Sequence, residues 1–353
     1  MSCCVECFRD LHIRATIEKY GKVGLCDFCG SKDVAILDLS LSSNLVSDMI
    51  TGLVQIYKVS DSAEAKPLKY ALRDDWDIFT AGAETILDLT RKLCGTAYPD
   101  DADIFTRDVT IEQLSDVDYL RDCGIVRGSS WGDFSESIKY SNRFHSGMFN
   151  PDVFESYLRT ISSTHPVGSE AFRARITSDR KGFTTHEMGA PPKGKRTGGR
   201  VNPDGVGVLY LSSDKITVLN EVRANAYDYI SIGRFRAKRS IVVANLSGVG
   251  KSSPFLFSSE LEQFAANRKV FQDIAAEIAK PLRRSDSPLE YLPTQYIAEF
   301  IKSKKYDGVE FASTLRQGGY NLAVFDESLF ECVDVETVEV SEVLYTTEPL
   351  LSS

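Results

Sequence analysis

The chain has 353 residues and is acidic, with 41 Lys and Arg against 50 Asp and Glu and a formal net charge of −9. This charge argues against a general nucleic-acid binder, because such proteins gain affinity from basic surfaces that neutralise phosphates. The hydrophobic content of 42% is typical of a folded protein, and no apolar run is long enough to span a bilayer. The length allows two or three hydrophobic cores, so we expect a multidomain protein without membrane or nucleic-acid partners.

The amino terminus contains two Cys-x-x-Cys pairs, Cys4 with Cys7 and Cys26 with Cys29. Four thiolates at this spacing can close a tetrahedral shell around Zn²⁺, each pair supplying one side of the site. We therefore predict a structural zinc ion, with no open coordination position for catalysis. Cys3 is an alternative to Cys4 as the first ligand.

The chain contains eight cysteines, and no signal peptide precedes Cys3. Disulfides persist mainly in oxidising compartments, so we expect reduced thiols and a cytoplasmic location.

Helical periodicity dominates the next part of the chain. We expect helices over residues 45–57, 76–93, 111–122, 131–149 and 153–161. The Ser, Thr, Pro and Gly residues of 162–168 predict a linker. The resulting domains are a zinc-binding segment (1–36), a helical domain (37–161) and a catalytic domain (166–345).

A turn and a strand follow two glycines in the catalytic part. Gly198 and Gly199 precede Arg200 and let the backbone approach a bulky ligand, since glycine has no Cβ. The run Asn202-Pro203-Asp204-Gly205 predicts a tight turn, because proline presets φ and glycine supplies a positive φ. Residues 206–211 then predict a buried strand.

A short helix is expected after this strand, which should end near Tyr210. Ser213 or Asp214 suits its N-cap, because a short polar side chain accepts hydrogen bonds from the first free amides. Glu221 lies beside the apolar face of the helix, where it can point into a cleft. The segment thus brings together an arginine, an aromatic ring and one carboxylate, which suits chemistry on a charged nucleotide.

Six short motifs, in chain order, resemble those of the RES domain family. They are Phe-Arg-Ala-Arg at 172–175, Gly-Ala-Pro-Pro at 189–192, Gly-Arg-Val-Asn-Pro at 199–203, Tyr210 with Glu221, Asp-Gly-Val-Glu-Phe-Ala-Ser at 307–313, and Gly-Tyr-Asn-Leu-Ala-Val-Phe at 319–325. The resemblance implies an α+β domain with an ADP-ribosyltransferase-like split β-sheet. It also implies an enzyme that takes NAD⁺ as substrate and breaks its nicotinamide–ribose bond.

The family's functional residues carry over position by position. Arg173 takes the first arginine of the family, Arg200 the second, Tyr210 the aromatic, Glu221 the glutamate and Ser313 the serine. Arg175 is an alternative to Arg173. Family members include toxins that deplete NAD by hydrolysis or phosphorolysis and enzymes that transfer ADP-ribose to proteins. The resemblance therefore also implies an antitoxin or another inhibitory partner, and it leaves the acceptor of ADP-ribose open.

The expected chemistry needs only one acid. Departure of nicotinamide leaves an oxocarbenium-like ribose, which a fixed carboxylate such as Glu221 would stabilise. Glycosidases commonly add a second carboxyl group to protonate the leaving group, but nicotinamide departs as a neutral base. Arg173 and Arg200 would hold the diphosphate through their planar donors. Tyr210 would stack on the cationic nicotinamide ring, and Ser313 would donate a hydrogen bond.

The helical segment also resembles the HEPN-type domain that precedes some RES domains. HEPN ribonucleases use an arginine and a histidine four to six residues later. Arg159 and His165 fit this spacing, but the Ser, Thr and Pro residues around them break any helix. Arg143 and His145 are too close together, so we interpret both pairs as structural.

Other functional classes fit the sequence less well. Gly250-Lys251-Ser252 follows a strand, but a P-loop needs glycine where Asn245 stands, and no helical pattern follows. The sequence also lacks the glycine fingerprint that a Rossmann dehydrogenase requires. The main competing interpretation is a non-catalytic adaptor that binds a partner and merely holds a nucleotide; loss of Glu221 would be tolerated in such a protein.

Overall fold

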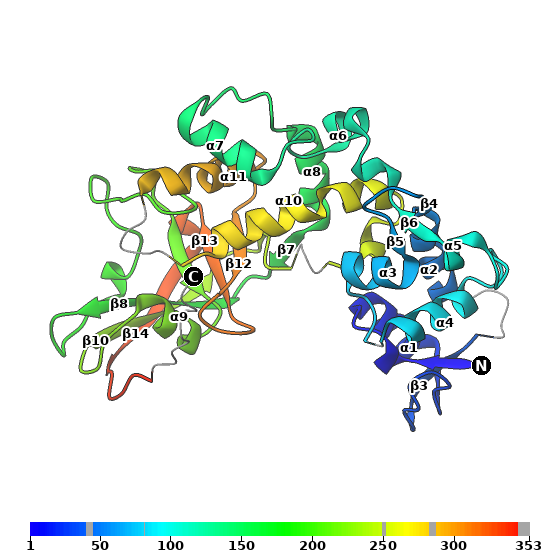
Figure 1. Cartoon of the computed structure of the whole chain (residues 1–353). Helices are drawn as coiled ribbons and strands as arrows, with labels where there is room; N and C mark the ends of the chain where they lie inside the picture. Colours follow the sequence, from blue (N-terminus) through cyan, green and yellow to red (C-terminus); the bar gives the residue numbers. More distant parts are fainter. Residues whose placement is uncertain (40–44, 81, 249–251, 282–286, 345–353) are drawn as a thin grey trace, which may run out of the picture. The chain divides into compact units, whose positions relative to one another are not determined.

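The computed structural model describes residues 1–39, 45–80, 82–248, 252–281 and 287–344 (Figure 1). Its contacts divide the chain into two compact units, each described here by itself. The first comprises Met1–Gly128 and Gly250–Lys269, and the second comprises Ser129–Val249 and Val270–Ser353. The predicted α+β class is confirmed, with a cysteine cluster at the amino terminus, a helical region after it and a mixed β-sheet.

The first unit begins with a small antiparallel sheet. Strands β1 (Ser2–Cys4), β3 (Val34–Asp38) and β2 (Lys22–Gly24) pair in that order. Between β1 and β2 lie the 3-10 turn η1 (Val5–Cys7) and helix α1 (Leu11–Tyr20). The Asp10 side chain caps α1 by accepting from the amides of His12 and Ile13.

The remainder of the first unit is mainly helical. Its helices are α2 (Leu45–Gln55), α3 (Leu68–Trp76), α4 (Ala83–Leu93), α5 (Asp103–Thr106) and α6 (Val117–Cys123), with a small sheet of β4 (Lys58–Val59), β6 (Asp108–Thr110) and β5 (Lys66–Pro67). The helix predicted over 76–93 begins later than expected, as α4 at Ala83, because α3 ends at Trp76. Asp77 ends α3 because its φ of 51° is left-handed, which a right-handed helix cannot continue.

Helix α10 (Leu261–Ala279) starts among the residues of the first unit. There the ring of Phe264 stacks on those of Phe257 and Trp76, with centroid distances of 4.1 and 6.0 Å. The Asn267 side chain accepts from the amide of Ile125, and Arg268 donates to the carbonyl of Asp75. Aromatic packing and buried hydrogen bonds thus fix the first half of α10 within this unit.

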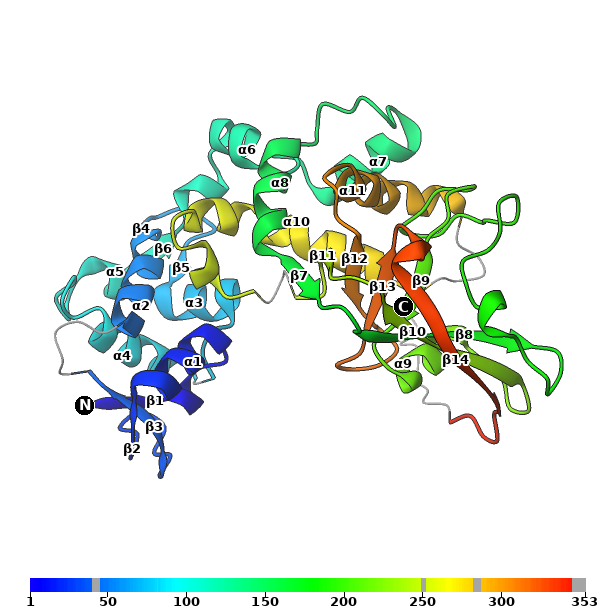
Figure 2. The same cartoon turned by 180° about the vertical axis from the view of Figure 1, so that it is seen from behind.

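The second unit is built on an eight-stranded sheet in the order β14-β10-β8-β9-β13-β12-β11-β7 (Figure 2). The strands are β7 (Ser162–His165), β8 (Glu170–Thr177), β9 (Leu209–Ser212), β10 (Tyr229–Ala237), β11 (Ile241–Asn245), β12 (Gly308–Ala312), β13 (Tyr320–Val324) and β14 (Phe330–Glu339). Strands β11 and β12 pair in parallel, and the other described pairs are antiparallel.

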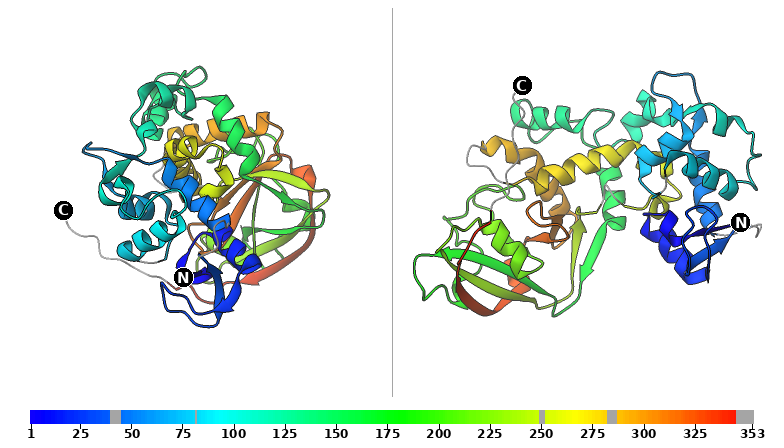
Figure 3. Two further views of the ribbon diagram at one scale, coloured as in Figure 1. Left: turned by 90° about the vertical axis from the view of Figure 1, so that its right-hand side faces the viewer. Right: turned by 60° about the horizontal axis from the view of Figure 1, so that its bottom comes forward.

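Helices α7 (Trp131–Tyr140), α8 (Pro151–Thr160), α11 (Leu292–Ser303) and the second half of α10 lie together in the second unit (Figures 1 and 3). Aromatic rings join them. Phe154 and Tyr157 of α8 contact Phe271 of α10, and Phe154 also contacts Phe300 of α11. Helix α9 (Lys215–Val222) instead packs on β8, where Val218 and Ala174 share a core cluster.

Strands β7 and β14 form the two edges of the sheet. The linker predicted over 162–168 is wrong in part, because Ser162–His165 forms strand β7 against β11. At the opposite edge, β14 is formed by the carboxyl-terminal part of the described chain. Residues 249–251, which include most of the sequence considered for a P-loop, lie outside the described part; Pro254–Phe257 after them forms a 3-10 turn.

Within the described ranges, no helix has the length and apolarity that a bilayer crossing requires.

Candidate functional site

The segment from Thr197 to Val206 forms a loop that is held from inside. Asn202 is buried, and its Nδ2 donates to the carbonyls of Thr197, Pro203 and Val206. Its Oδ1 accepts from the hydroxyl of Tyr210 at 2.7 Å. The predicted tight turn is present, with Gly205 at a φ of 82°. The Asn202 side chain therefore provides a hydrogen-bond donor for three backbone carbonyls of the loop, which fixes the conformation of the loop.

Gly199 allows this arrangement. A Cβ at Gly199 would lie 3.0 Å from the Tyr210 hydroxyl and 3.2 Å from Asn202 Oδ1. The sequence predicts that a ligand approaches the backbone at Gly199. In the structure, Tyr210 of strand β9 makes this close approach instead.

Helix α9 carries Glu221 and begins as predicted. The Asp214 side chain caps it by accepting from the amides of Ile216 and Thr217, and it also pairs with Arg316 at 2.8 Å. Partial burial alone would raise the pKa of Asp214, but the hydrogen bonds from Thr217 and Ser213 and the charge of Arg316 lower it to about 2. Asp214 therefore stays ionised and fixes the start of α9 to the loop after β12.

Glu221 receives two hydrogen bonds on a single oxygen. The hydroxyl of Ser313 donates to Oε1 at 2.8 Å, and Nδ2 of Asn321 donates to the same atom at 2.8 Å. Asn321 is itself oriented by the hydroxyl of Ser212, which donates to its Oδ1 at 2.7 Å. No hydrogen bond from another described residue reaches Oε2 of Glu221, so that oxygen can accept one from a ligand.

Arg173 and Arg175 alternate along β8 and have different surroundings. Arg173 lines the cavity described below, and its Nη1 donates to the carbonyl of Tyr210 at 3.2 Å. Its Nε is buried and has no hydrogen-bond partner among the described residues. Burial lowers the pKa of Arg173, and the nearby charge of Arg175 lowers it further. An acceptor, best an anion, would satisfy Arg173.

Arg175 instead lies over the ring of Phe183, 3.9 Å from its centroid, and donates to the carbonyl of Glu187 at 2.5 Å. Of the two candidates, Arg173 is thus the one at the cavity.

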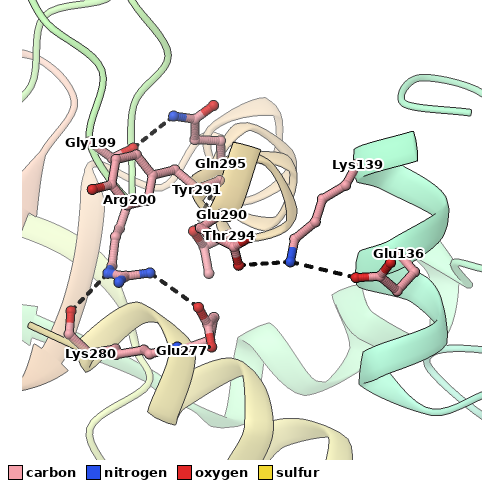
Figure 4. A network of polar contacts seen from close by, with 10 residues as sticks. All are labelled: Glu136, Lys139, Gly199, Arg200, Glu277, Lys280, Glu290, Tyr291, Thr294 and Gln295. Carbon is pink, nitrogen blue, oxygen red and sulfur yellow. Dashed lines mark hydrogen bonds and ion pairs between the residues drawn. The ribbon is translucent and has the colours of Figure 1, made fainter. Parts of the chain in front are cut away.

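Arg200 is buried, with a side-chain exposure of 6%, and several groups surround its guanidinium (Figure 4). Its Nε donates to the carbonyl of Lys280 at 2.7 Å, and its Nη1 is 3.1 Å from Oε1 of Glu277. Its guanidinium carbon lies 5.1 Å from the ring centroid of Tyr291. These contacts tie Arg200 to the end of α10 and to the start of α11.

These residues surround a cavity of about 420 Å³ in the second unit, a volume within the range of small-molecule sites. Arg173, Arg200, Tyr210 and Glu221 line it, and Ser313 reaches it through Glu221. Among the described lining residues, the cations Arg173, Arg196, Arg200 and Lys280 face a single carboxylate, Glu221. The lining is therefore suited to an anionic ligand with one hydroxyl or cationic group near Glu221.

Sequence reasoning missed several of these residues. Asn321 stands inside a quoted motif, and its place two residues after the motif's first glycine was the available signal. Arg196 belongs to a basic run that resembles a solvated loop; its side chain is only 19% exposed and would collide with any Cβ at Gly207. Glu277 lies in the last turn of α10 and Lys280 directly follows that helix, far along the chain, and no local pattern indicates their contact with Arg200.

The four predicted zinc ligands converge in the first unit. The sulfur atoms of Cys4, Cys7, Cys26 and Cys29 all lie within 4.8 Å of one another. Cys4 to Cys7, Cys4 to Cys29 and Cys7 to Cys26 measure 3.8, 3.3 and 3.6 Å. A tetrahedral zinc site with bonds of about 2.3 Å places its sulfurs roughly 3.8 Å apart. The donor set therefore fits Zn²⁺, and Cys4 rather than Cys3 belongs to it.

These features define an α+β protein with a cysteine cluster and an arginine-lined cavity in a mixed-sheet domain. The sequence profile described as "RES domain" matches residues 171–347, about half of the chain. The chain therefore belongs to the RES domain family. A comparison with individually curated proteins gives no match.

Among solved structures, the chain is similar to one from the M. tuberculosis MbcT–MbcA toxin–antitoxin complex. The match has 10% identity and a TM-score of 0.32, and it covers 53% of this chain and 91% of the other. A likeness at this level says nothing about the site.

The comparisons do not support the HEPN-type resemblance of the helical segment. His165, one of the residues weighed for such a site, lies in β7, where its Nε2 is 2.7 Å from Oε2 of the buried Glu310.

Proposed function

We propose that the second unit binds NAD⁺ in the arginine-lined cavity and breaks the bond between nicotinamide and ribose. The observation that carries this proposal is the arrangement around Glu221. Its Oε1 is held by Ser313 and Asn321, its Oε2 accepts no hydrogen bond within the described part of the chain, and the residue lines the cavity. Membership of the RES domain family supports the same reaction class.

Glu221 is proposed as the catalytic carboxylate. As the C1′–N bond breaks, the bonding electrons leave with nicotinamide, which departs neutral, and positive charge develops on the ribose. Oε2 would accept a hydrogen bond from a ribose hydroxyl and stabilise that charge at short range. A nucleophile then forms the new bond at C1′; water would lose its proton to solvent or to Glu221. Ser313 and Asn321 would keep the carboxylate in its orientation.

Arg173 is proposed as the ligand of the diphosphate. It is largely buried, it lines the cavity, and its Nε has no partner among the described residues. A phosphate oxygen would supply the missing acceptor and the missing opposite charge. Arg196 and Lys280 add positive charge to the same cavity and would attract the anion.

Tyr210 is proposed to stack on the nicotinamide ring. Its hydroxyl is fixed by Asn202, and burial raises its pKa well above the ordinary tyrosine value, so the phenol stays neutral. A neutral, immobilised ring offers its electron-rich face to a cation at little entropic cost. Because this attraction is lost when nicotinamide becomes neutral, Tyr210 would favour binding more than bond cleavage.

The test is release of nicotinamide from NAD⁺ by the purified protein, followed by chromatography. Glu221→Gln keeps the shape of the side chain and removes its charge. We expect it to bind NAD⁺ but to turn it over at least about a hundredfold more slowly, the loss typical for one electrostatic group at a transition state. Equal rates in the two proteins would exclude Glu221 from the mechanism, and an inactive wild type that binds NAD⁺ would favour the adaptor.

Mass spectrometry of the products, with and without phosphate, identifies the acceptor. ADP-ribose indicates water, and its 1″-phosphate indicates phosphorolysis; a mass added to a protein indicates transfer. An enzyme that depletes NAD⁺ would harm its own cell, so we also propose that a partner protein of the antitoxin type restrains it.

We further propose that Cys4, Cys7, Cys26 and Cys29 hold a structural zinc ion. All four positions of the tetrahedron would be protein thiolates, so the ion would stabilise the fold and have no place for a substrate.

A further inference from the structure

We propose that Arg200 is a positioning residue rather than a phosphate ligand. With Glu277 it forms a latch that fixes the loop of residues 198–206 as one wall of the cavity, while Arg173 binds the diphosphate. This inference rests on the proposed function for the identity of the ligand.

The polar contacts of Arg200 point to this role. Its Nε donates to the carbonyl of Lys280 at 2.7 Å, and its Nη1 pairs with Glu277 at 3.1 Å. The ring of Tyr291 lies beside the guanidinium. A ligand phosphate would have to compete with a carboxylate already paired in a buried place, where ion pairs are screened least. Figure 4 shows the guanidinium directed toward Glu277 and the Lys280 carbonyl.

The loop next to Arg200 is anchored on the same helices. Gln295 of α11 donates through one nitrogen to the carbonyls of Gly199 and Asn202, at 2.8 and 3.0 Å. Gly199 and Asn202 are also joined by a backbone hydrogen bond of 2.9 Å. The residues on either side of Arg200 are therefore fixed to α11, and Arg200 itself is fixed to the end of α10. Both attachments determine where the cavity wall lies.

Arg173 presents the opposite case. Its one side-chain hydrogen bond to the described residues goes to the carbonyl of Tyr210, and its buried Nε has none. No carboxylate of the described chain lies within 4 Å of it. Burying a guanidinium without an anion is unfavourable, and a bound phosphate would remove that cost. The two arginines of the family pattern thus have separate tasks.

The two possible roles of Arg200 predict opposite effects of a substitution at Glu277. If Arg200 binds phosphate directly, Glu277 competes with the ligand, and Glu277→Gln leaves the affinity for NAD⁺ unchanged or increases it. If Arg200 is a latch, Glu277→Gln loosens the cavity wall and weakens binding. The two roles also differ for nicotinamide riboside, which contains the ribose and the ring but no phosphate.

The experiment measures dissociation constants of NAD⁺ and nicotinamide riboside by calorimetry in the full chain carrying Glu221→Gln. We expect Arg173→Lys to raise the dissociation constant of NAD⁺ about tenfold or more, which is the scale of one charge-assisted hydrogen bond. The dissociation constant of nicotinamide riboside should change less than about twofold. Arg200→Lys and Glu277→Gln should each raise the dissociation constants of both ligands by a similar factor. Their double variant should lose little more than either alone, because the two residues act as a unit.

Arg239→Lys is the matched control, because Arg239 also pairs with an acid, Asp307, in the second unit but does not line the cavity. It should bind both ligands like the parent protein. Tighter or unchanged NAD⁺ binding in Glu277→Gln, or a loss in Arg200→Lys restricted to NAD⁺, would overturn the latch.

Hydrogen exchange provides a readout that needs no ligand. Arg200→Lys and Glu277→Gln should both accelerate amide exchange in residues 198–206, with Arg239→Lys unchanged. If the protein binds no NAD⁺, the proposed function fails, and this measurement still decides the latch: unchanged exchange in both variants rejects it.

Discussion

At the scale of single residues, the two oxygens of Glu221 are not equivalent. Oε1 accepts from Ser313 and Asn321, whereas Oε2 accepts from none of the described groups. A carboxylate held through one oxygen has a fixed plane, so the other oxygen points in a defined direction. Preorganisation of this kind is more effective than charge alone, because no dipole has to reorient as the reaction proceeds.

Asn321→Ala tests this positioning. It removes one donor to Glu221 and also leaves the hydroxyl of Ser212 without its acceptor, so we expect a loss of unfolding free energy of about 1 kcal/mol. We expect kcat for nicotinamide release to fall about tenfold or more, with a smaller change in KM. Steady-state kinetics and urea unfolding measure the two effects.

Asn225→Ala, at an asparagine outside the cavity lining, is a suitable comparison and should leave kcat unchanged. A kcat for Asn321→Ala equal to that of the parent protein would show that Asn321 has no part in orienting Glu221.

At the scale of elements, local patterns predicted some structures and could not predict others. The cap and helix that carry Glu221 were predictable, because Asp214 and the residues after it interact within a few positions. The strand before them is shorter than predicted: β9 begins at Leu209 rather than at 206. On the helix itself Ile216 is exposed, whereas Thr217 and Val218 are buried, and Val218 packs against β8.

Strand β7 could not be predicted because its sequence, Ser-Ser-Thr-His, has the composition of a loop. Only pairing with β11, almost eighty residues later, makes it a strand. The latch of Arg200 was hidden for the same reason, since Glu277 and Gln295 reach the loop through tertiary contacts. The order of the motifs, by contrast, was sufficient to select Arg173, Arg200, Tyr210 and Glu221. The structure places these four residues around one cavity.

The cysteine cluster joins η1 to the turn after β2, and a metal would hold these short elements together. Cys26→Ser with Cys29→Ser removes two ligands, so we expect the purified variant to lose its zinc. Its first unit should also unfold at a lower temperature than that of the parent protein, because bound metal stabilises the folded form. Elemental analysis and calorimetry measure both.

Cys332→Ser changes a thiol of the second unit that belongs to no such cluster of described residues, and this variant should keep the zinc. A parent protein purified without zinc, and unaffected by zinc added back, would contradict the metal site.

At the scale of the whole molecule, the two units are interleaved in the sequence. The chain leaves the first unit after Gly128, returns at Gly250 and leaves it again after Lys269. The returning segment supplies Phe264, which is fully buried against Trp76 and Phe257. The first unit is therefore incomplete without residues that follow most of the sheet in sequence.

Phe264→Ala measures how much this returning segment contributes. The cavity left by a buried ring typically lowers the free energy of unfolding by about 3–5 kcal/mol. We expect a loss of this size in chemical unfolding monitored by tryptophan fluorescence, to which Trp76 contributes. Leu256→Ala, at a half-exposed position of the same segment, should cost much less; similar losses in both would show that the segment is not packed as described.

The first and last strands of this sheet in sequence, β7 and β14, are also its two edge strands. The family match opens at residue 171, after β7 has ended. A recombinant piece cut at that boundary would remove the strand that pairs with β11, and it would leave the carboxyl group of the buried Glu310 without its hydrogen-bond partner His165. The smallest piece expected to fold on its own must therefore begin further upstream than the family boundary, to include at least Ser162.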